Sequence, residues 1–395
     1  MAQGSNDVAS SLSLAEETTS TKRKQLITSS GALTSQPLPT LPFDLLPEIL
    51  CRLPVKLLVQ LRCLCKFFNS LISDPEFAKK HLHLSTMRHH LIVSSKNDKS
   101  RELLLFDFPI SSVFSSSIGT HTQLNLPISL KTNGYGKHLA VCSCDGILCI
   151  SATSVDHRYA ILWNPSIRKF KILPPQEDYR WKRVLDSFYS FGYDHFIHNY
   201  KVIVIYLCIR SKTNEVCVHT LGTDKWRRIH DFPFCGIIRG SGIFVSGTVN
   251  WFAFDVPNKC CREIVSFDLE KESYKILSQP NLEKKSWNLG VLKDCLCIFS
   301  HNDIFVDVWI MKEYGNKESW TKLYNISYMG VPISHAYGNV LYNSEDNQML
   351  VDLMREGNKR KVVLYNSKNG ILNFREIEIG HLMSPNVYIE SLVSP

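Results

Sequence analysis

Apolar residues follow a helical period in the leucine-rich segment 41–72. Pro42 lies at the start of the first predicted helix, and Pro54 ends it because the residue before a proline disfavours helical backbone. A second helix is predicted from about Leu57, and further short helices follow it up to about residue 85. One face of the first helix is an apolar stripe with helical spacing, consisting of Leu45, Leu46, Ile49, Leu50 and Leu53.

The predicted helical unit is too small to bury all of its apolar side chains. A unit of about 45 residues leaves much of its surface in water even when it is folded. A dense apolar set on such a unit therefore indicates a surface that another molecule covers. The alternative is that the helices pack against the downstream part of the chain.

From His90 onward the helical period is replaced by short β-rich runs between polar turns. A unit of apolar strand, polar turn and second strand opened by an aromatic recurs, as in 161–173, 216–229 and 264–277. A period near 50 residues with several strands is typical of kelch-like propeller blades, so six repeats predict six blades. An irregular β-sandwich with recurrent hairpins is the alternative. The six repeats are anchored at Phe106, Trp163, His219, Phe267, Trp309 and Tyr365.

The two ends of the β-domain are predicted to pair with each other. Unpaired strand edges invite aggregation, and ring closure removes them. We therefore expect a strand near 387–393 to pair into the first blade around 91–108.

A motif in the helical segment keeps one register over residues 41–77. It consists of Leu41-Pro42, Asp44-Leu45-Leu46, Glu48-Ile49-Leu50, Arg52-Leu53-Pro54, Lys56, Leu61-Arg62, Cys65-Lys66, Leu71-Ile72 and Asp74-Pro75-Glu76-Phe77. With this motif the segment resembles the F-box family, which implies binding to the Skp adaptor of cullin–RING ubiquitin ligases. The residues predicted to contact the adaptor are Leu41, Pro42, Leu45, Leu46, Ile49, Leu50, Leu53, Pro54, Leu57, Leu58 and Leu61.

Further short motifs lie along the β-rich segment. They include Cys144-Asp145-Gly146-Ile147-Leu148-Cys149, Leu162-Trp163-Asn164-Pro165-Ser166, Phe191-Gly192-Tyr193-Asp194 and Gly247-Thr248-Val249-Asn250-Trp251. With them the segment is similar to the F-box-associated domain of plant F-box proteins, the group that includes S-locus F-box proteins and kelch-repeat relatives. The resemblance implies a domain that holds target proteins.

Composition adds a third part to this organisation. Residues 1–40 contain no aromatic residue and are rich in Ser and Thr, so they cannot bury enough surface to offset their ordering entropy. The predicted chain is an α+β multidomain protein: a disordered arm over 1–40, a helical F-box over 41–85, and an all-β, six-bladed propeller over 86–395.

Charge and cysteine content exclude several classes of protein. The net charge of +8 is spread along the chain and forms no long basic stripe, so we expect no nucleic-acid partner. No apolar run approaches the roughly 20 residues that span a bilayer, so we expect no membrane partner and a cytoplasmic or nuclear protein. The run 22–24 is either a nuclear import signal or a solvated basic tail. Thirteen cysteines without a Cys-x-x-Cys pair predict reduced, packed side chains.

The sequence offers no motif for catalysis. It lacks a nucleophile elbow, a phosphate-binding loop and a zinc-binding His-Glu-x-x-His helix, so we expect no catalytic residue, no cofactor and no metal. One loop between two repeats joins aromatic to cationic side chains, a composition enriched at binding hot spots. An exposed basic loop without a ligand is the alternative. The predicted target-binding residues in this loop are Tyr179, Arg180, Trp181 and Arg183.

Three functions fit these patterns. The first is a non-enzymatic substrate receptor of an SCF-type ubiquitin ligase, joined through a Skp-type adaptor to cullin and RING subunits. The second is a ligase-independent propeller that binds protein or glycan, which would not need the helical unit. The third is a propeller enzyme such as a kelch-type oxidase, which would need a metal constellation. The helical motif favours the first.

Overall fold

The computed structural model shows the chain as two compact units, Met1–Leu46 and Pro47–Pro395. Of the first unit only Leu45 and Leu46 are described, so the predicted arm over 1–40 lies outside the described residues. The described residues are 45–84, 88–96, 103–115, 121–127, 140–153, 158–175, 184–208, 214–234, 237–254, 262–282, 286–302, 305–327, 338–354, 360–368, 371–379 and 385–395.

Short helices come first in the described chain: α1 (Leu46–Leu50), α2 (Val55–Leu61), α3 (Lys66–Ser73) and α4 (Pro75–Leu84). Pro54 immediately precedes α2, where a missing backbone N–H costs no helical hydrogen bond. Asp74 caps α4, because its Oδ1 accepts hydrogen bonds from the backbone N–H of Glu76 at 2.9 Å and of Phe77 at 3.0 Å. The interior of this helical part includes Cys51, Val55, Leu58, Ile72, Phe77 and Ala78.

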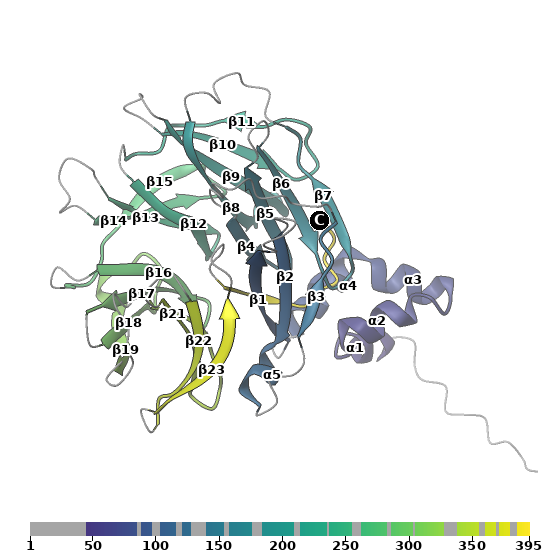
Figure 1. Ribbon diagram of the computed structural model, residues 1–395. Helices are drawn as coiled ribbons and strands as arrows, with labels where there is room; N and C mark the ends of the chain where they lie inside the picture. Colours follow the sequence, from purple (N-terminus) through teal and green to yellow (C-terminus); the bar gives the residue numbers. More distant parts are fainter. Residues whose placement is uncertain are drawn as a thin grey trace, which may run out of the picture. The chain divides into compact units, whose positions relative to one another are not determined.

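The rest of the described chain forms six four-stranded antiparallel sheets, the blades of a propeller, which Figure 1 shows arranged around a common centre. Blade 1 is β24 (Asn386–Ile389), β1 (His89–Lys96), β2 (Leu103–Pro109) and β3 (Thr122–Leu124). Blade 2 is β4 (Ala140–Cys144), β5 (Ile147–Thr153), β6 (Arg158–Asn164) and β7 (Lys169–Ile172). Blade 3 is β8 (Val184–Asp194), β9 (Asn199–Cys208), β10 (Glu215–Thr220) and β11 (Arg227–Arg228).

The remaining blades have the same strand order. Blade 4 is β12 (Ile237–Val245), β13 (Thr248–Phe254), β14 (Arg262–Asp268) and β15 (Ser273–Leu277). Blade 5 is β16 (Ser286–Leu292), β17 (Cys295–His301), β18 (Phe305–Met311) and β19 (Trp320–Ser327). Blade 6 is β20 (Gly338–Asn343), β21 (Gln348–Met354), β22 (Arg360–Asn366) and β23 (Ile371–Ile379). A helix α5 (Ile110–Phe114) follows β2, and a 3₁₀ helix η3 (Lys317–Ser319) precedes β19.

The six-bladed prediction is therefore confirmed, and the β-sandwich alternative is wrong. Each of the six predicted anchors lies on the third strand of its own blade, from Phe106 on β2 to Tyr365 on β22. The repeat is visible in the sequence because every blade buries this strand between its neighbours. On these third strands Ile161, Phe267 and Val308 are fully buried.

An aromatic residue at or next to the start of the fourth strand joins each of blades 3, 4 and 5 to the blade before it. Trp226 Nε1 donates a hydrogen bond to the Pro174 carbonyl at 2.8 Å, and Trp320 Nε1 donates to the Ser278 carbonyl at 2.9 Å. Tyr274 lies at the same position in blade 4, and its hydroxyl donates to the carbonyl of His230 at 3.2 Å. These aromatics therefore fill space between blades. They also donate hydrogen bonds to backbone carbonyls that follow the last strand of the preceding blade.

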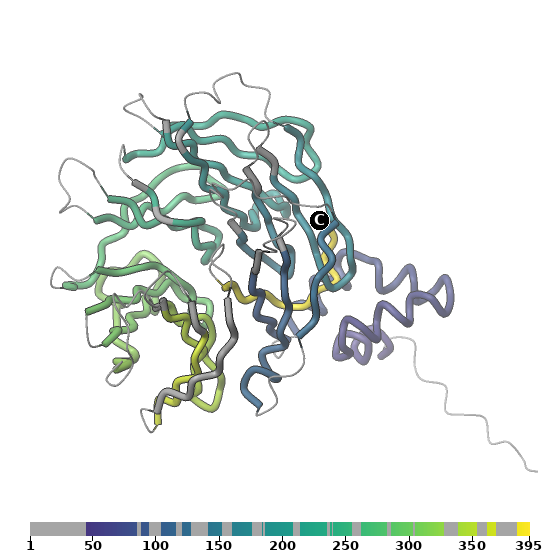
Figure 2. Tube along the Cα trace, viewed as in Figure 1, coloured from purple at the N-terminus to yellow at the C-terminus, as the bar shows by residue number. Residues whose placement is uncertain are grey.

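The predicted closure between the chain's end and the first blade is confirmed. Strand β24 pairs antiparallel with β1, from His89 opposite Ile389 to Ile92 opposite Asn386. Figure 2 shows this yellow C-terminal segment alongside the blue first blade. The paired strand is shorter than the expected segment 387–393.

Side chains beyond the backbone ladder also hold the C-terminal segment. Asn164 Nδ2 donates hydrogen bonds to the carbonyls of Ser391 at 3.1 Å and Val393 at 2.8 Å. Gly146 packs against the same segment with φ of +79°, and a Cβ at this position would lie 2.4 Å from the Ile389 carbonyl oxygen. Only glycine fits this turn, which explains its place in the Cys144–Cys149 motif.

Candidate functional site

Large apolar side chains are exposed on the helical segment of the second unit. Ile49 on α1 is 44% exposed and Leu57 on α2 is 45% exposed. Leu64, between α2 and α3, is 69% exposed, and Phe67 on α3 is 48% exposed. We call these four side chains the exposed apolar set. These four side chains are the candidate site of the helical segment.

The structure distributes the predicted adaptor-binding residues over several environments. Leu46, Leu53 and Leu61 are half-buried, and Pro54 is exposed. Leu45, which belongs to the first unit, is 51% exposed. Leu41 and Pro42 lie outside the described residues.

Two of the predicted contact residues are buried in the free chain. Leu50 is 3% exposed and Leu58 is 0% exposed, so both side chains pack inside the chain. They belong to the same leucine-rich pattern as the exposed residues, and only packing between helices separates the two groups. Leu64 and Phe67, in contrast, are exposed but were not among the residues predicted from the sequence. The available signal was their apolar character within the same leucine-rich segment.

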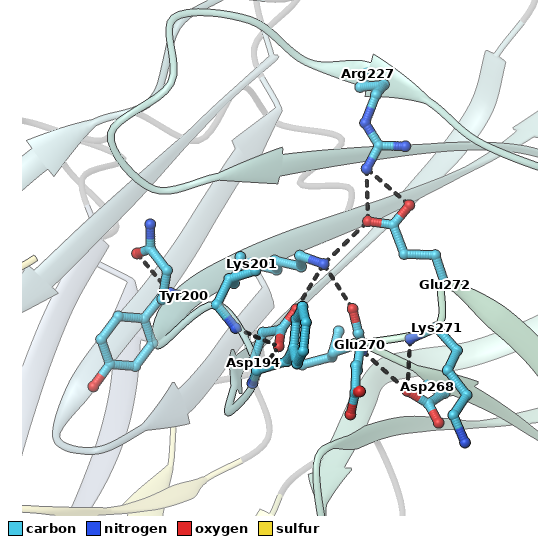
Figure 3. A network of polar contacts seen from close by, with 12 residues as sticks. Asp194, Tyr200, Lys201, Arg227, Asp268, Glu270, Lys271 and Glu272 are labelled. Carbon is cyan, nitrogen blue, oxygen red and sulfur yellow. Dashed lines mark hydrogen bonds and ion pairs between the residues drawn. The ribbon is translucent and has the colours of Figure 1, made fainter.

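A buried network of charges lies between blades 3 and 4 (Figure 3). The Lys201 ammonium contacts the Asp194 carboxylate at 2.8 Å, the Leu269 carbonyl at 2.6 Å and the Glu272 carboxylate at 3.0 Å. Arg227 Nη2 donates to both carboxylate oxygens of Glu272, at 2.6 and 2.8 Å. Every donor of the buried ammonium therefore has an acceptor, which is the condition for burying a charge without a large penalty.

The same network shapes an exposed turn between β8 and β9. Asp194 Oδ1 accepts hydrogen bonds from the backbone N–H of Phe196 at 2.9 Å and of Ile197 at 3.3 Å. Burial raises the pKa of Asp194. The hydrogen bond of Lys201, the backbone N–H groups of Ile197 and Phe196 and the charge of Lys201 together lower this pKa by more, so it lies below its ordinary value. Asp194 therefore stays ionised and holds both the turn and Lys201. We assign this network to stability and not to chemistry.

A second polar cluster lies where the ring closes. His90 Nδ1 lies 3.0 Å from the carboxylate of Asp107, and His90 Nε2 lies 3.5 Å from Glu390. The Tyr388 hydroxyl donates to Asp107 Oδ1 at 3.1 Å. Burial lowers the pKa of His90, but the hydrogen bond and charge of Asp107 and the charge of Glu390 together raise it by more, so the pKa lies above its ordinary value. Residues of β1, β2 and the C-terminal segment are thus joined electrostatically.

His301 on β17 predicts a pH dependence of folding stability. It is 4% exposed, and burial lowers its pKa to about 4. Between pH 6.5 and 4 the unfolded chain binds this proton and the folded chain does not, so stability falls as the pH falls. The loss attributable to His301 is about 1.4 kcal/mol per pH unit and roughly 3 kcal/mol over the whole window. Urea unfolding at several pH values should show a shallower slope for His301→Gln than for the wild type. Equal slopes would contradict the assignment.

The described residues offer no cluster suited to a metal ion: no three or more His, Cys, Asp or Glu side chains are grouped for coordination. Cys142, Cys144, Cys149 and Cys297 carry thiols and are buried among apolar side chains. No helix in this part of the chain has the length and hydropathy to cross a bilayer. The predicted target-binding loop, with Tyr179, Arg180, Trp181 and Arg183, lies outside the described residues.

Comparisons with known proteins agree with this architecture. The F-box domain family matches residues 38–80, and the family described as F-box associated beta propeller domain matches residues 86–395. The F-box/kelch-repeat protein At3g23880 of Arabidopsis thaliana is 28% identical over 370 residues, which cover 90% of this chain and 96% of that protein. The F-box protein CPR1 of the same plant is 30% identical over 358 residues, which cover 82% of each chain. The chain therefore belongs to the family of F-box proteins with a C-terminal F-box-associated β-propeller.

Proposed function

We propose that this protein is the substrate-recognition subunit of an SCF-type cullin–RING ubiquitin ligase. The observation that carries the proposal is the coincidence of an F-box with exposed large apolar side chains on its helices. A Skp-type adaptor is the partner that F-box domains generally bind. In this proposal the adaptor covers the exposed apolar set, Ile49, Leu57, Leu64 and Phe67, with Leu45 as a further contact.

The proposed contribution to ubiquitin transfer is positioning without chemistry. A target held on the propeller would have its lysines at high local concentration near the conjugating enzyme, which the adaptor, cullin and RING subunits bring to the complex. The polar networks at Lys201 and His90 are internally paired and support the blades in this proposal. The protein would then act in the cytoplasm or nucleus, with neither cofactor nor metal.

Affinity capture from plant cells with the proteasome inhibited tests this function. Wild-type protein should capture a Skp-type adaptor, cullin and further proteins, and a form lacking residues 41–85 should lose the adaptor and cullin. Proteins that both forms capture are candidate targets. Failure of the wild type to capture any adaptor would favour a ligase-independent binding propeller.

The loop between β7 and β8 is a proposed target contact. Arginine and tryptophan are enriched at binding hot spots because they combine large contact area with directional polar groups. Replacing Arg180, Trp181 and Arg183 with alanine should reduce capture of targets at least tenfold. Capture of the adaptor should remain unchanged, which serves as the internal control. Undiminished capture of targets by the triple variant would assign the loop to solvent.

A further inference from the structure

Arg88 joins the helical segment to the first blade. Its Nη1 donates a hydrogen bond to the Leu53 carbonyl at 2.5 Å, and its Nη2 donates to the Arg52 carbonyl at 2.9 Å. The backbone carbonyl of Arg88 accepts a hydrogen bond from the N–H of Glu390 at 3.0 Å. One residue therefore contacts the α1–α2 connection through its side chain and the C-terminal segment through its backbone.

The two carbonyls that accept hydrogen bonds from Arg88 suit the planar geometry of its guanidinium group. Arg52 and Leu53 lie between the end of α1 and the start of α2, where carbonyls have no partner within a helix. Guanidinium presents two parallel donors, so it satisfies two neighbouring carbonyls at once, whereas an ammonium is a single point of charge. His81 of α4 completes the cluster. It is 0% exposed, and its Nε2 lies 2.9 Å from the Leu53 carbonyl oxygen and 3.1 Å from Arg88 Nη1.

Further contacts from α4 to the propeller are electrostatic. The Lys79 ammonium lies 5.9 Å from the ring centroid of Tyr193 on β8, a cation–π arrangement. Burial raises the pKa of Asp145, and the charges of His83 and Lys79 act in the opposite direction. These partners are on blades 2 and 3, while Arg88 precedes blade 1. The helical segment is thus held at separate points: the Arg88 cluster binds backbone carbonyls of the α1–α2 connection, and the Lys79 ammonium lies beside Tyr193.

We infer that Arg88 is a positioning residue that fixes the orientation of the F-box helices relative to the propeller. This inference rests on the proposed function for its biological consequence. A receptor that directs ubiquitin transfer by proximity must hold its propeller at a defined angle to the adaptor, because that angle decides which lysines reach the conjugating enzyme. Loss of the Arg88 guanidinium removes both hydrogen bonds to the α1–α2 connection and leaves the contact of Lys79 with Tyr193. The helices therefore gain orientational freedom relative to the propeller without losing their own fold.

The test uses the full chain and measures orientation directly. Spin labels carried on unnatural amino acids at exposed Ser70 and Lys312 avoid the native cysteines and report the distance between α3 and blade 5. Arg88→Ala should at least double the width of the distance distribution, and Arg88→Lys should give an intermediate width. Arg52→Ala is the matched control, because Arg52 contributes only its backbone carbonyl to the Arg88 cluster. Its distance distribution should match that of the wild type.

A ubiquitin-transfer assay is the functional part of this test. In a ligase reconstituted with adaptor, cullin and RING subunits, the probe is modification of this protein's own lysines, mapped by mass spectrometry. Arg88→Ala should redistribute modification over the lysines while its affinity for the adaptor stays within twofold of the wild type. A lowered melting temperature with an unchanged distance distribution, in either Arg88 variant, would overturn the inference. Absence of adaptor binding by the wild type would overturn the proposed function instead, and the distance measurement would still decide the role of Arg88.

Discussion

Lysines at positions 49 and 57 are expected to abolish capture of a Skp-type adaptor and leave the propeller folded. Ile49 and Leu57 are 44% and 45% exposed, so the free protein tolerates charge at both positions. In an apolar interface each lysine would be buried without a partner, at a cost of several kcal/mol. Since about 1.4 kcal/mol is a tenfold change in affinity, the double variant should bind the adaptor at least roughly a thousandfold more weakly by calorimetry.

The propeller offers a matched control for this variant. Phe170 and Ile172 on β7 are 46% and 49% exposed, so Phe170→Lys with Ile172→Lys introduces the same charge at the same exposure. This control should bind the adaptor like the wild type. Captured targets should persist with the Ile49→Lys, Leu57→Lys variant while their ubiquitination stops. Affinity within threefold of the wild type in a folded double variant would refute the assignment of these two side chains.

Truncation after Gly380 is expected to make the protein aggregate. The truncation removes β24, which pairs with β1, so the β1 edge of blade 1 becomes an unpaired template for other chains. It also removes Tyr388, whose hydroxyl donates to the Asp107 carboxylate, and the carbonyls that bind Asn164. Buried polar groups would therefore lose partners at the same time as the strand edge is exposed.

Light scattering after size exclusion and the cooperativity of thermal unfolding check this expectation. Removing only Ser394 and Pro395 is the control, because Val393 is the last residue whose carbonyl accepts from Asn164. The short truncation should remain monomeric and melt in one sharp transition. The same behaviour from the truncation after Gly380 would show that closure by β24 is dispensable.

The local sequence pattern was sufficient to predict the six blades and the closure of the ring. Alternation of apolar and polar residues and a recurring aromatic near every fiftieth residue predicted six blades, because each blade must bury the same central strand. The pairing of the C-terminal segment with β1 could be expected because an unpaired strand edge invites aggregation, which every propeller must avoid. In the helical segment, the leucine period predicted helices with an apolar face, and the motif predicted the F-box.

Tertiary structure alone decided which apolar residues face outward and which distant polar groups meet. Leu50 and Leu57 look alike in the sequence, yet one is buried and the other is exposed, because burial depends on how neighbouring helices cross. Arg88 reaches carbonyls 35 and 36 residues away, and Lys201 reaches Glu272 across 71 residues. No local period encodes such pairs, since their separation along the chain depends on the path between elements. The sequence thus determined the helices, the strands and the protein family. Packing in three dimensions determined which apolar side chains are exposed and which distant polar groups are in contact.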